Sequence, residues 1–150
     1  MINALKEKYE VTVNEPGDLY TGINLKWDYV KRTFHLTMDD YIANLRAKFN
    51  HPNPKKYQHS SHHHTPINYG TNVQYAAETP IGPPLNNSGK LCIQQLVVAI
   101  QYYARAVDKK ILVALSKIFQ QQSSPTEDTN RDMIKLLDYL ATYPDNVITY

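Results

Sequence analysis

The tripeptide Met38-Asp39-Asp40 contains the residue types that most strongly suggest chemistry. Adjacent carboxylates on a hairpin can hold two divalent cations, which activate an attacking hydroxyl and stabilise a leaving pyrophosphate. That arrangement requires strands on both sides, whereas here a helical apolar pattern starts at once. Acids in the first turn of a helix are stabilised by the helix dipole. We therefore interpret Asp39 and Asp40 as helix-start acids rather than metal ligands.

A group of closely spaced histidines is the second candidate: His59, His62, His63 and His64. Neutral imidazoles at short spacing can bind zinc, but closed zinc sites usually combine two separated ligand pairs. The only cysteine, Cys92, cannot supply the second pair. We interpret the histidines as solvated loop residues and predict no metal or cofactor; a metal-binding loop is the alternative.

The sequence contains no motif that is typical of nucleophilic catalysis. Cys92 lies beside an apolar helical stripe and is interpreted as a small core residue. No nucleophile elbow and no glycine-rich phosphate loop occurs, so no catalytic residue is predicted. Tyr102 and Tyr103 point to different faces of a helix, so at most one lies in the core. The other, with Arg105, could stack on a base or contact a phosphate; a half-buried tyrosine at the core edge is the alternative.

Strand patterns dominate the N-terminal part of the chain. The expected elements are a helix end over residues 2–8, a strand over Tyr9–Val13, a turn at 16–18, a strand over Leu19–Tyr29 and its hairpin partner over Thr33–Leu36. Gly22, inside the second strand, suggests a bulge or a close approach by another backbone. Thr37 is then the expected N-cap of a short amphipathic helix that ends near Phe49.

Residues 51–89 contain six of the nine prolines and five of the six histidines, without any apolar period. A segment this long is unusual inside a compact domain. We expect it either to be disordered or to wrap another part of the molecule.

Helical apolar stripes return in the C-terminal part. Two stripes, from Ile93 to Val107 and from Ile111 to Phe119, predict two helices joined near Asp108. A third helix is expected to start at an N-cap Ser124 and to stop before Pro144, followed by a strand over Asn146–Tyr150. The sequence thus predicts an α+β fold with a small antiparallel sheet and one helix (1–50), a linker (51–89) and a three-helix unit with a terminal strand (90–150).

Composition restricts the number of domains, the cellular compartment and the kind of partner that we expect. At 150 residues with 42% apolar residues, the chain fits one domain or a piece of a larger one. One cysteine excludes a disulfide framework. No apolar run reaches the roughly 20 residues of a membrane span, and no signal peptide is recognisable. We expect an intracellular protein, in the cytoplasm or nucleus, without a membrane partner. Residues 41–77 contain four basic residues and no acid, which can attract a polyanion; a solvated loop is the alternative.

The order of three motifs resembles a known family over nearly the whole chain. They are YTGI at 20–23, YYARAVD followed by LVALS at 102–116, and LLDYLATYPD at 136–145. Together they are similar to the C-terminal part of the reverse transcriptase of copia-type LTR retrotransposons. The resemblance implies an RNA-directed DNA polymerase as the parent protein, with a primer-grip hairpin starting at residues 19–23, a thumb helix at 37–50, and a connection toward ribonuclease H at 89–143.

The resemblance also implies contacts with the backbone of a template–primer duplex, weak and without sequence preference. Gly22 would let backbone pass close to the primer strand. The residues expected to bind nucleic acid are Tyr20, Gly22, Lys26, Lys31, Arg32, Arg46, Lys48, Lys55 and Lys56. The segment Tyr102–Asp108 would be a helix corner rather than an active centre.

Departures from the family pattern affect individual positions. Tyr20-Thr21 stands where the family favours Phe-Leu, and the sequence around Arg105 shifts that arginine relative to the family's Thr-Arg-Pro-Asp corner. The resemblance places the polymerase carboxylates before Met1 and the first ribonuclease H aspartate after Tyr150. We therefore expect a fragment without either active site, whose partners include the missing palm and ribonuclease H domains, and whose intact parent requires Mg²⁺. The alternative is a non-catalytic helical protein-interaction module.

Overall fold

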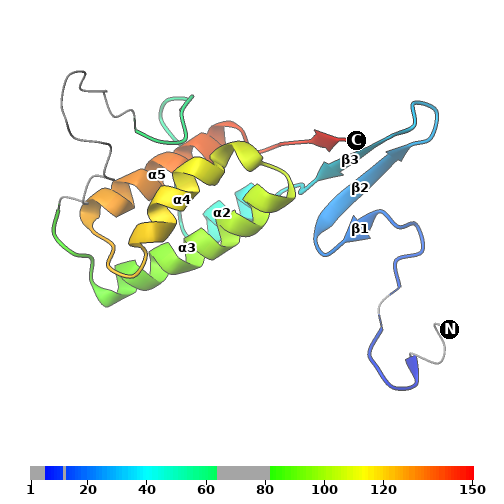
Figure 1. Cartoon of the computed structure of the whole chain (residues 1–150), viewed down its shortest axis with the longest axis horizontal. Coiled ribbons are helices and arrows are strands. Elements are labelled where there is room, and N and C mark those ends of the chain that lie inside the picture. The colour runs from blue at the N-terminus through cyan, green and yellow to red at the C-terminus, as the bar shows by residue number, and fades with distance from the viewer. Residues whose placement is uncertain (1–5, 12, 64–81) are drawn as a thin grey trace, which may run out of the picture.

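The computed structural model describes residues 6–11, 13–63 and 82–150, and within them it shows a four-stranded antiparallel sheet beside four α-helices (Figure 1). This is the predicted α+β class. The strands, in sheet order, are β1 Leu19–Tyr20, β2 Ile23–Asp28, β3 Thr33–Thr37 and β4 Ile148–Thr149. The helices are α2 Tyr41–Lys48, α3 Asn87–Ala106, the short 3₁₀ helix η1 Lys109–Ile111, α4 Leu112–Gln121 and α5 Glu127–Thr142.

The helices bury their predicted apolar stripes against one another. Positions three or four apart share a helix face, so each stripe supplies one wall of the core. The largest fully buried apolar side chains are Ile42, Ile93, Val97, Ile100, Tyr103, Ile111, Ile118, Met133, Leu136 and Leu140. Phe119, the last member of its predicted stripe, is 45% exposed. Cys92 is also exposed, so its interpretation as a core residue is wrong; it lies one position away from the stripe that contains Ile93.

The expected strand over Leu19–Tyr29 is wrong as a single strand, because the chain reverses at Thr21-Gly22. These two residues have φ of 49° and 82°, and Tyr20 pairs with Ile23 across them. Positive φ at both central residues is typical of the two-residue hairpin turn whose twist matches antiparallel strands. Gly22 therefore supplies a backbone conformation rather than a bulge, and a Cβ added there would meet nothing within 4 Å.

Two other N-terminal expectations have different outcomes. Residues 9–11 and 13 form no strand, and residue 12 lies outside the described residues, as do residues 2–5 of the expected helix end. The turn before β1 is present: the Asn14 side chain accepts a hydrogen bond of 2.8 Å from the Gly17 backbone N–H. The return strand of the hairpin is confirmed as β3, with Leu25 opposite Leu36.

The terminal strand is confirmed as β4, and its partner is the N-terminal hairpin. Leu36 pairs with Ile148, and Phe34 exchanges two backbone hydrogen bonds of 3.0 Å with Tyr150. This pairing joins segments more than a hundred residues apart in the sequence into one sheet. The hairpin and the helical unit are therefore connected through the sheet as well as through residues 51–89.

Helix starts differ from the predictions. Thr37 is the last residue of β3 and pairs with Asn24, so it cannot cap α2; Asp40, with φ of 59°, occupies the N-cap position without a side-chain bond. Asp39 and Asp40 therefore precede the helix, and its first turn contains no acid. At the start of α3, the side chain of Asn86 accepts a hydrogen bond from Gly89 N–H. The last three residues of the predicted linker thus belong to this helix.

The cap of α5 is Thr126, not Ser124. Thr126 forms a reciprocal capping box with Thr129. Nearby, the Glu127 N–H donates to Pro83 C=O at 3.1 Å and the Leu85 N–H donates to Pro125 C=O at 2.9 Å. This short pairing keeps the chain extended up to Thr126, which moves the start of the helix past the predicted serine.

Leu136→Ala tests the core. Leu136 is fully buried, so its truncation should lower the free energy of unfolding by about 2–5 kcal/mol. Urea denaturation of the two proteins measures this difference. Ile134→Ala is the matched control, because Ile134 lies on the same helix but is 42% exposed and should cost less than about 1 kcal/mol. Equal losses at both positions would contradict the assigned core face.

Candidate nucleic-acid interface

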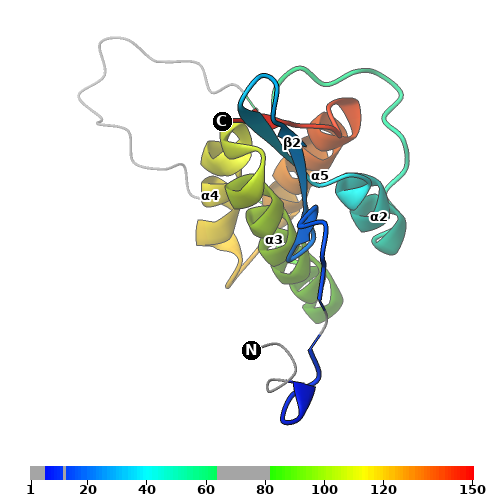
Figure 2. The ribbon, with the colours of Figure 1, turned by 90° about the vertical axis from the view of Figure 1, so that its right-hand side faces the viewer.

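The β2–β3 hairpin extends past the end of the helices (Figure 1), and Figure 2, seen from that end, shows it in front of them. Its turn is held by the Asp28 carboxylate, whose Oδ1 accepts from the N–H groups of Val30 and Lys31 at 3.1 and 2.9 Å. Arg32, with φ of 54°, completes the reversal. The predicted turn thus presents two neighbouring cations, Lys31 and Arg32, at the tip of a projecting hairpin.

One face of the sheet is apolar along its whole length. Alternate residues of a strand share a face, and directly paired residues on neighbouring strands do as well. At the helical end of this face, Ile23 and Leu36 pack against the core. Farther along the hairpin, the paired residues Trp27 and Phe34 follow on the same face. The helices cover the near end of the face and leave its far end exposed.

Four aromatic side chains occupy this far end, and we call them the aromatic stripe: Trp27, Tyr29, Phe34 and Tyr150. The ring centroids of Trp27 and Phe34 are 4.9 Å apart, and those of Phe34 and Tyr150 are 5.1 Å apart. Tyr29 lies 6.4 Å from Trp27. Trp27, Tyr150 and Tyr29 are 51%, 59% and 84% exposed. The sequence prediction missed this site, although the Trp and Tyr of LKWDY were its visible signal.

The structure separates the predicted nucleic-acid-binding residues into two groups. The first group belongs to the sheet: Tyr20, Gly22, Lys26, Lys31 and Arg32. Tyr20 is 67% exposed on the short edge strand β1. Lys26 points to the opposite face from Trp27 and forms an ion pair of 3.3 Å with Asp39. Lys31 lies 3.5 Å from Asp28 with its side chain 77% exposed.

The second group lies on α2 and the segment that follows it: Arg46, Lys48, Lys55 and Lys56. Arg46 donates to the Asn53 side chain at 2.7 Å, which ties the end of α2 to the following segment. Lys48 lies over the ring of Phe49. Lys55 and Lys56 are exposed. The hairpin tip therefore presents its cations apart from this second group.

Residues 51–63 run along α5, so this part of the predicted linker wraps another element. His51 Nε2 lies 2.8 Å from Asp138 Oδ1, His59 Nδ1 lies 2.6 Å from the Tyr143 hydroxyl, and His63 Nδ1 lies 2.8 Å from Asp132 Oδ1. These three histidines are therefore engaged with α5 and its end rather than simply solvated.

The remaining histidine predictions have mixed outcomes. His62 is exposed, and His64 lies outside the described residues, as does most of the remaining linker. Within residues 6–11, 13–63 and 82–150, no three His, Cys, Asp or Glu side chains are grouped so that they could hold a metal ion. In the same ranges, no helix has the length and apolar character needed to cross a membrane.

The two adjacent tyrosines of α3 have different environments, as predicted from their different helix faces. Tyr103 is 1% exposed, stacks on Tyr41 at 5.6 Å and donates its hydroxyl hydrogen to Pro144 C=O at 2.9 Å. Tyr102 is 41% exposed, and its hydroxyl donates to the backbone carbonyl of Thr21. Tyr102 therefore fastens the β1–β2 turn to the helices.

Asp108, at the corner between α3 and η1, is completely buried. Its Oδ2 accepts from the Asn146 amide at 3.0 Å, and Asn146 Oδ1 accepts from Lys110 at 2.9 Å. Within the described part of the chain, Asp108 Oδ1 has no hydrogen-bond partner, and the Lys110 ammonium is 3.9 Å away. Burial raises the pKa of this carboxyl above its usual value. The group links the helix corner to the segment that leads into β4, so its geometry is that of a structural tie.

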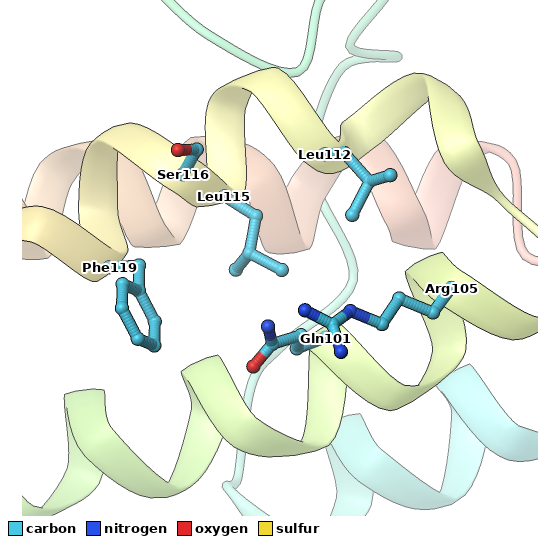
Figure 3. Close-up of a pocket in the computed structure, with 6 residues that line it drawn as sticks. All are labelled: Gln101, Arg105, Leu112, Leu115, Ser116 and Phe119. Atoms are coloured by element: carbon cyan, nitrogen blue, oxygen red, sulfur yellow. The ribbon is translucent and has the colours of Figure 1, made fainter.

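A hollow of about 270 Å³ lies between α3 and α4 (Figure 3). Its lining residues are Gln101, Arg105, Leu112, Leu115, Ser116 and Phe119. Figure 3 shows the Arg105 side chain lying over Gln101 in the space between the two helices. A second hollow of about 390 Å³ shares Gln101 and Arg105 and is also lined by Val98 and Tyr102. Together they form a largely apolar groove around one guanidinium group.

Comparison of the chain with protein-family models, curated proteins and solved structures gave no match.

Asp108→Asn tests the buried carboxyl. Because its folded pKa is raised, the wild-type stability contributed by this group is present at low pH and is lost as the pH rises from about 4 through the raised value. Asp108→Asn should remove that loss, so its free energy of unfolding should match the wild type in acid and exceed it at neutral pH. Denaturation at a series of pH values measures the difference. Asp145→Asn, at an exposed position, is the control. A variant that is less stable than the wild type only at neutral pH would contradict the sign of the shift.

Proposed function

We propose that this chain is a non-catalytic module that contacts the phosphate backbone of nucleic acid through its projecting hairpin. The observation that carries the proposal is the position of Lys31 and Arg32 at the tip of β2–β3, beyond the helices. Within the resemblance to copia-type reverse transcriptases, the hairpin is the primer grip of a polymerase fragment and its ligand is a template–primer duplex. Mg²⁺ and the catalytic carboxylates would belong to the parent polymerase.

The charges of the hairpin suit a polyanion. Residues 19–37 contain three cations, Lys26, Lys31 and Arg32, and one acid, Asp28. The acid lies inside the turn, where its Oδ1 accepts two backbone hydrogen bonds and its Oδ2 lies 3.5 Å from the ammonium group of Lys31, whose side chain stays 77% exposed. Cationic side chains attract phosphates without reading base identity, so binding should be weak and independent of sequence. The second group of cations lies on α2 and residues 51–63. It adds phosphate contacts only for a ligand long enough to reach both groups.

The non-catalytic part of the proposal rests on the surroundings of Asp39 and Asp40. Both lie between β3 and α2, and Asp39 is paired with Lys26. Two metal ions need convergent acidic ligands, and the ammonium group of Lys26 competes with a cation for Asp39. We therefore assign these acids to the connection between sheet and helix.

A helical protein-interaction module is the second candidate, favoured by the groove around Arg105. Val98 is 65% exposed and Phe119 is 45% exposed along this groove. Exposed apolar side chains around one cation suit a partner that carries apolar residues and a carboxylate. This candidate predicts no dependence of nucleic-acid binding on the hairpin cations.

Replacing Lys31 and Arg32 by alanine tests the proposal. On duplex DNA the logarithm of the binding constant should fall with the logarithm of salt concentration, and the double variant should reduce the magnitude of that slope by about 2, at roughly 0.9 per phosphate contact. Fluorescence anisotropy of a labelled duplex between about 50 and 200 mM salt gives the slope, since phosphate contacts show themselves over this range.

The matched control removes the same number of charges from α5, through Arg131→Ala with Lys135→Ala. Arg131 and Lys135 both lie on α5, apart from the hairpin, so the slope should keep its wild-type value. Equal slopes for the hairpin variant and the wild type would refute the proposed interface. Wild-type binding without salt dependence would leave the protein-interaction module as the better account.

A further inference from the structure

We propose that an unpaired base stacks on the outer ring face of Trp27 and Tyr29, so that this chain prefers single-stranded nucleic acid to a fully paired duplex. The inference rests on the proposed function, because Lys31 and Arg32 would hold the phosphates of the same strand. It adds unpaired nucleotides as the ligand class. It also adds base stacking, which the basic residues alone do not provide.

The stripe is a stack of rings standing on the sheet. The planes of Trp27 and Phe34 are within 23° of parallel, and those of Phe34 and Tyr150 are within 15°. Parallel rings whose centroids are only about 5 Å apart overlap face to face with an offset. The order follows the strands, with Trp27 on β2, Phe34 on β3 and Tyr150 beside it after β4. Phe34 is therefore covered on both faces by its neighbours.

Free ring faces remain at the two ends of the stack. At the β2 end, Trp27 and Tyr29 have planes only 15° apart and together widen the outer surface. β1 pairs with the start of β2, and the residues before it continue along β2, because the Leu25 N–H donates to Asp18 C=O at 2.7 Å. This segment reaches the Trp27 ring only at Gly17, and Trp27 remains 51% exposed. The Trp27 indole N–H lies 3.4 Å from Gly17 C=O, which orients the ring. This end presents a broad, oriented and exposed π surface.

The neighbouring charges favour a nucleotide as the occupant of this surface. A base supplies a flat π face, and every base can stack without hydrogen-bond readout. Lys31 and Arg32 follow Tyr29 by two and three residues in the same turn, and we assign them the phosphates next to the stacked base. In a blunt duplex the bases already stack on one another, so a side-on surface of this kind gains nothing from them. A protein partner is the competing occupant that the experiment must separate.

Trp27 is the only tryptophan in the chain, so its fluorescence reports directly on the proposed contact. The full chain is titrated with the single strand (dT)12 and with a blunt 12-base-pair duplex, followed by both intrinsic fluorescence and the anisotropy of a labelled copy of each nucleic acid. We expect (dT)12 to quench Trp27 as it binds, and the duplex to bind with little quenching. The affinity for (dT)12 should exceed that for the duplex.

Tyr29→Leu is the test variant, because Tyr29 is 84% exposed and its loss leaves the core intact. The affinity for (dT)12 should fall at least about fivefold, as expected for loss of one base-stacking side chain, while the duplex affinity stays within about twofold. Tyr57→Leu is the matched control: it removes another exposed tyrosine, 78% accessible, from residues 51–63, and should change neither affinity.

The outcomes separate the two proposals. Binding of (dT)12 with a normal salt slope but without quenching of Trp27, or without loss of affinity in Tyr29→Leu, overturns base stacking and leaves the phosphate interface standing. Quenching that is lost in Tyr29→Leu but insensitive to salt supports stacking and refutes the phosphate contacts. Absence of binding to either nucleic acid refutes both and assigns the aromatic stripe to a protein partner.

Discussion

The apolar face of the sheet is longer than the helical body that covers it, and the exposure of the aromatic stripe follows from this mismatch. Ile23 and Leu36 occupy the covered end and contribute to the core. Trp27 and Phe34 continue the same face beyond the helices, where the Trp27 ring remains accessible and Phe34 is stacked between Trp27 and Tyr150. Burial of apolar area stabilises a fold, so a row of exposed aromatics lacks that benefit in the isolated chain. Stacking among the rings stabilises the exposed aromatics in part and also holds their planes parallel for a ligand.

The projecting hairpin is held in place by contacts near its base and by the sheet itself. Tyr102 binds the β1–β2 turn to α3, and β4 pairs with β3 along the other edge. Asn146, just before β4, connects this strand to the buried Asp108 and to Lys110. Three contacts therefore set the position of the hairpin relative to the helices: the Tyr102 hydrogen bond, the pairing of β4 with β3, and the link from Asn146 to the buried Asp108. The last of these lies at the corner between α3 and η1. β4 leads directly into Tyr150, which is hydrogen-bonded to Phe34, so a shift of this corner would move one ring of the aromatic stripe.

The histidine segment serves a different part of the molecule. Its contacts through His51 and His63 attach residues 51–63 to α5, away from the hairpin tip. This attachment places residues 51–63, which include Lys55 and Lys56, along α5, and Figure 1 shows this segment away from the β2–β3 turn. The basic residues that appear as one cluster in the sequence are thus distributed over separate surfaces. A ligand that touches only the hairpin would use two or three of them, which is why its affinity should be low.

The sequence by itself determined the local elements: the apolar period specified the helices containing Ile93, Ile118 and Leu136, and turn residues marked the hairpin. It did not determine the split at Thr21-Gly22 or the cap at Thr126, because β pairing with Ile23 and with Pro84 set the backbone there. Tertiary structure alone decided the pairing of Phe34 with Tyr150, the burial of Asp108 and the exposure of Trp27. Periodicity reports which side of an element is apolar, whereas its coverage depends on segments that are distant in the sequence. For the same reason, the candidate cations were visible in the sequence, but the aromatic surface beside them emerged only when the sheet was placed against the helices.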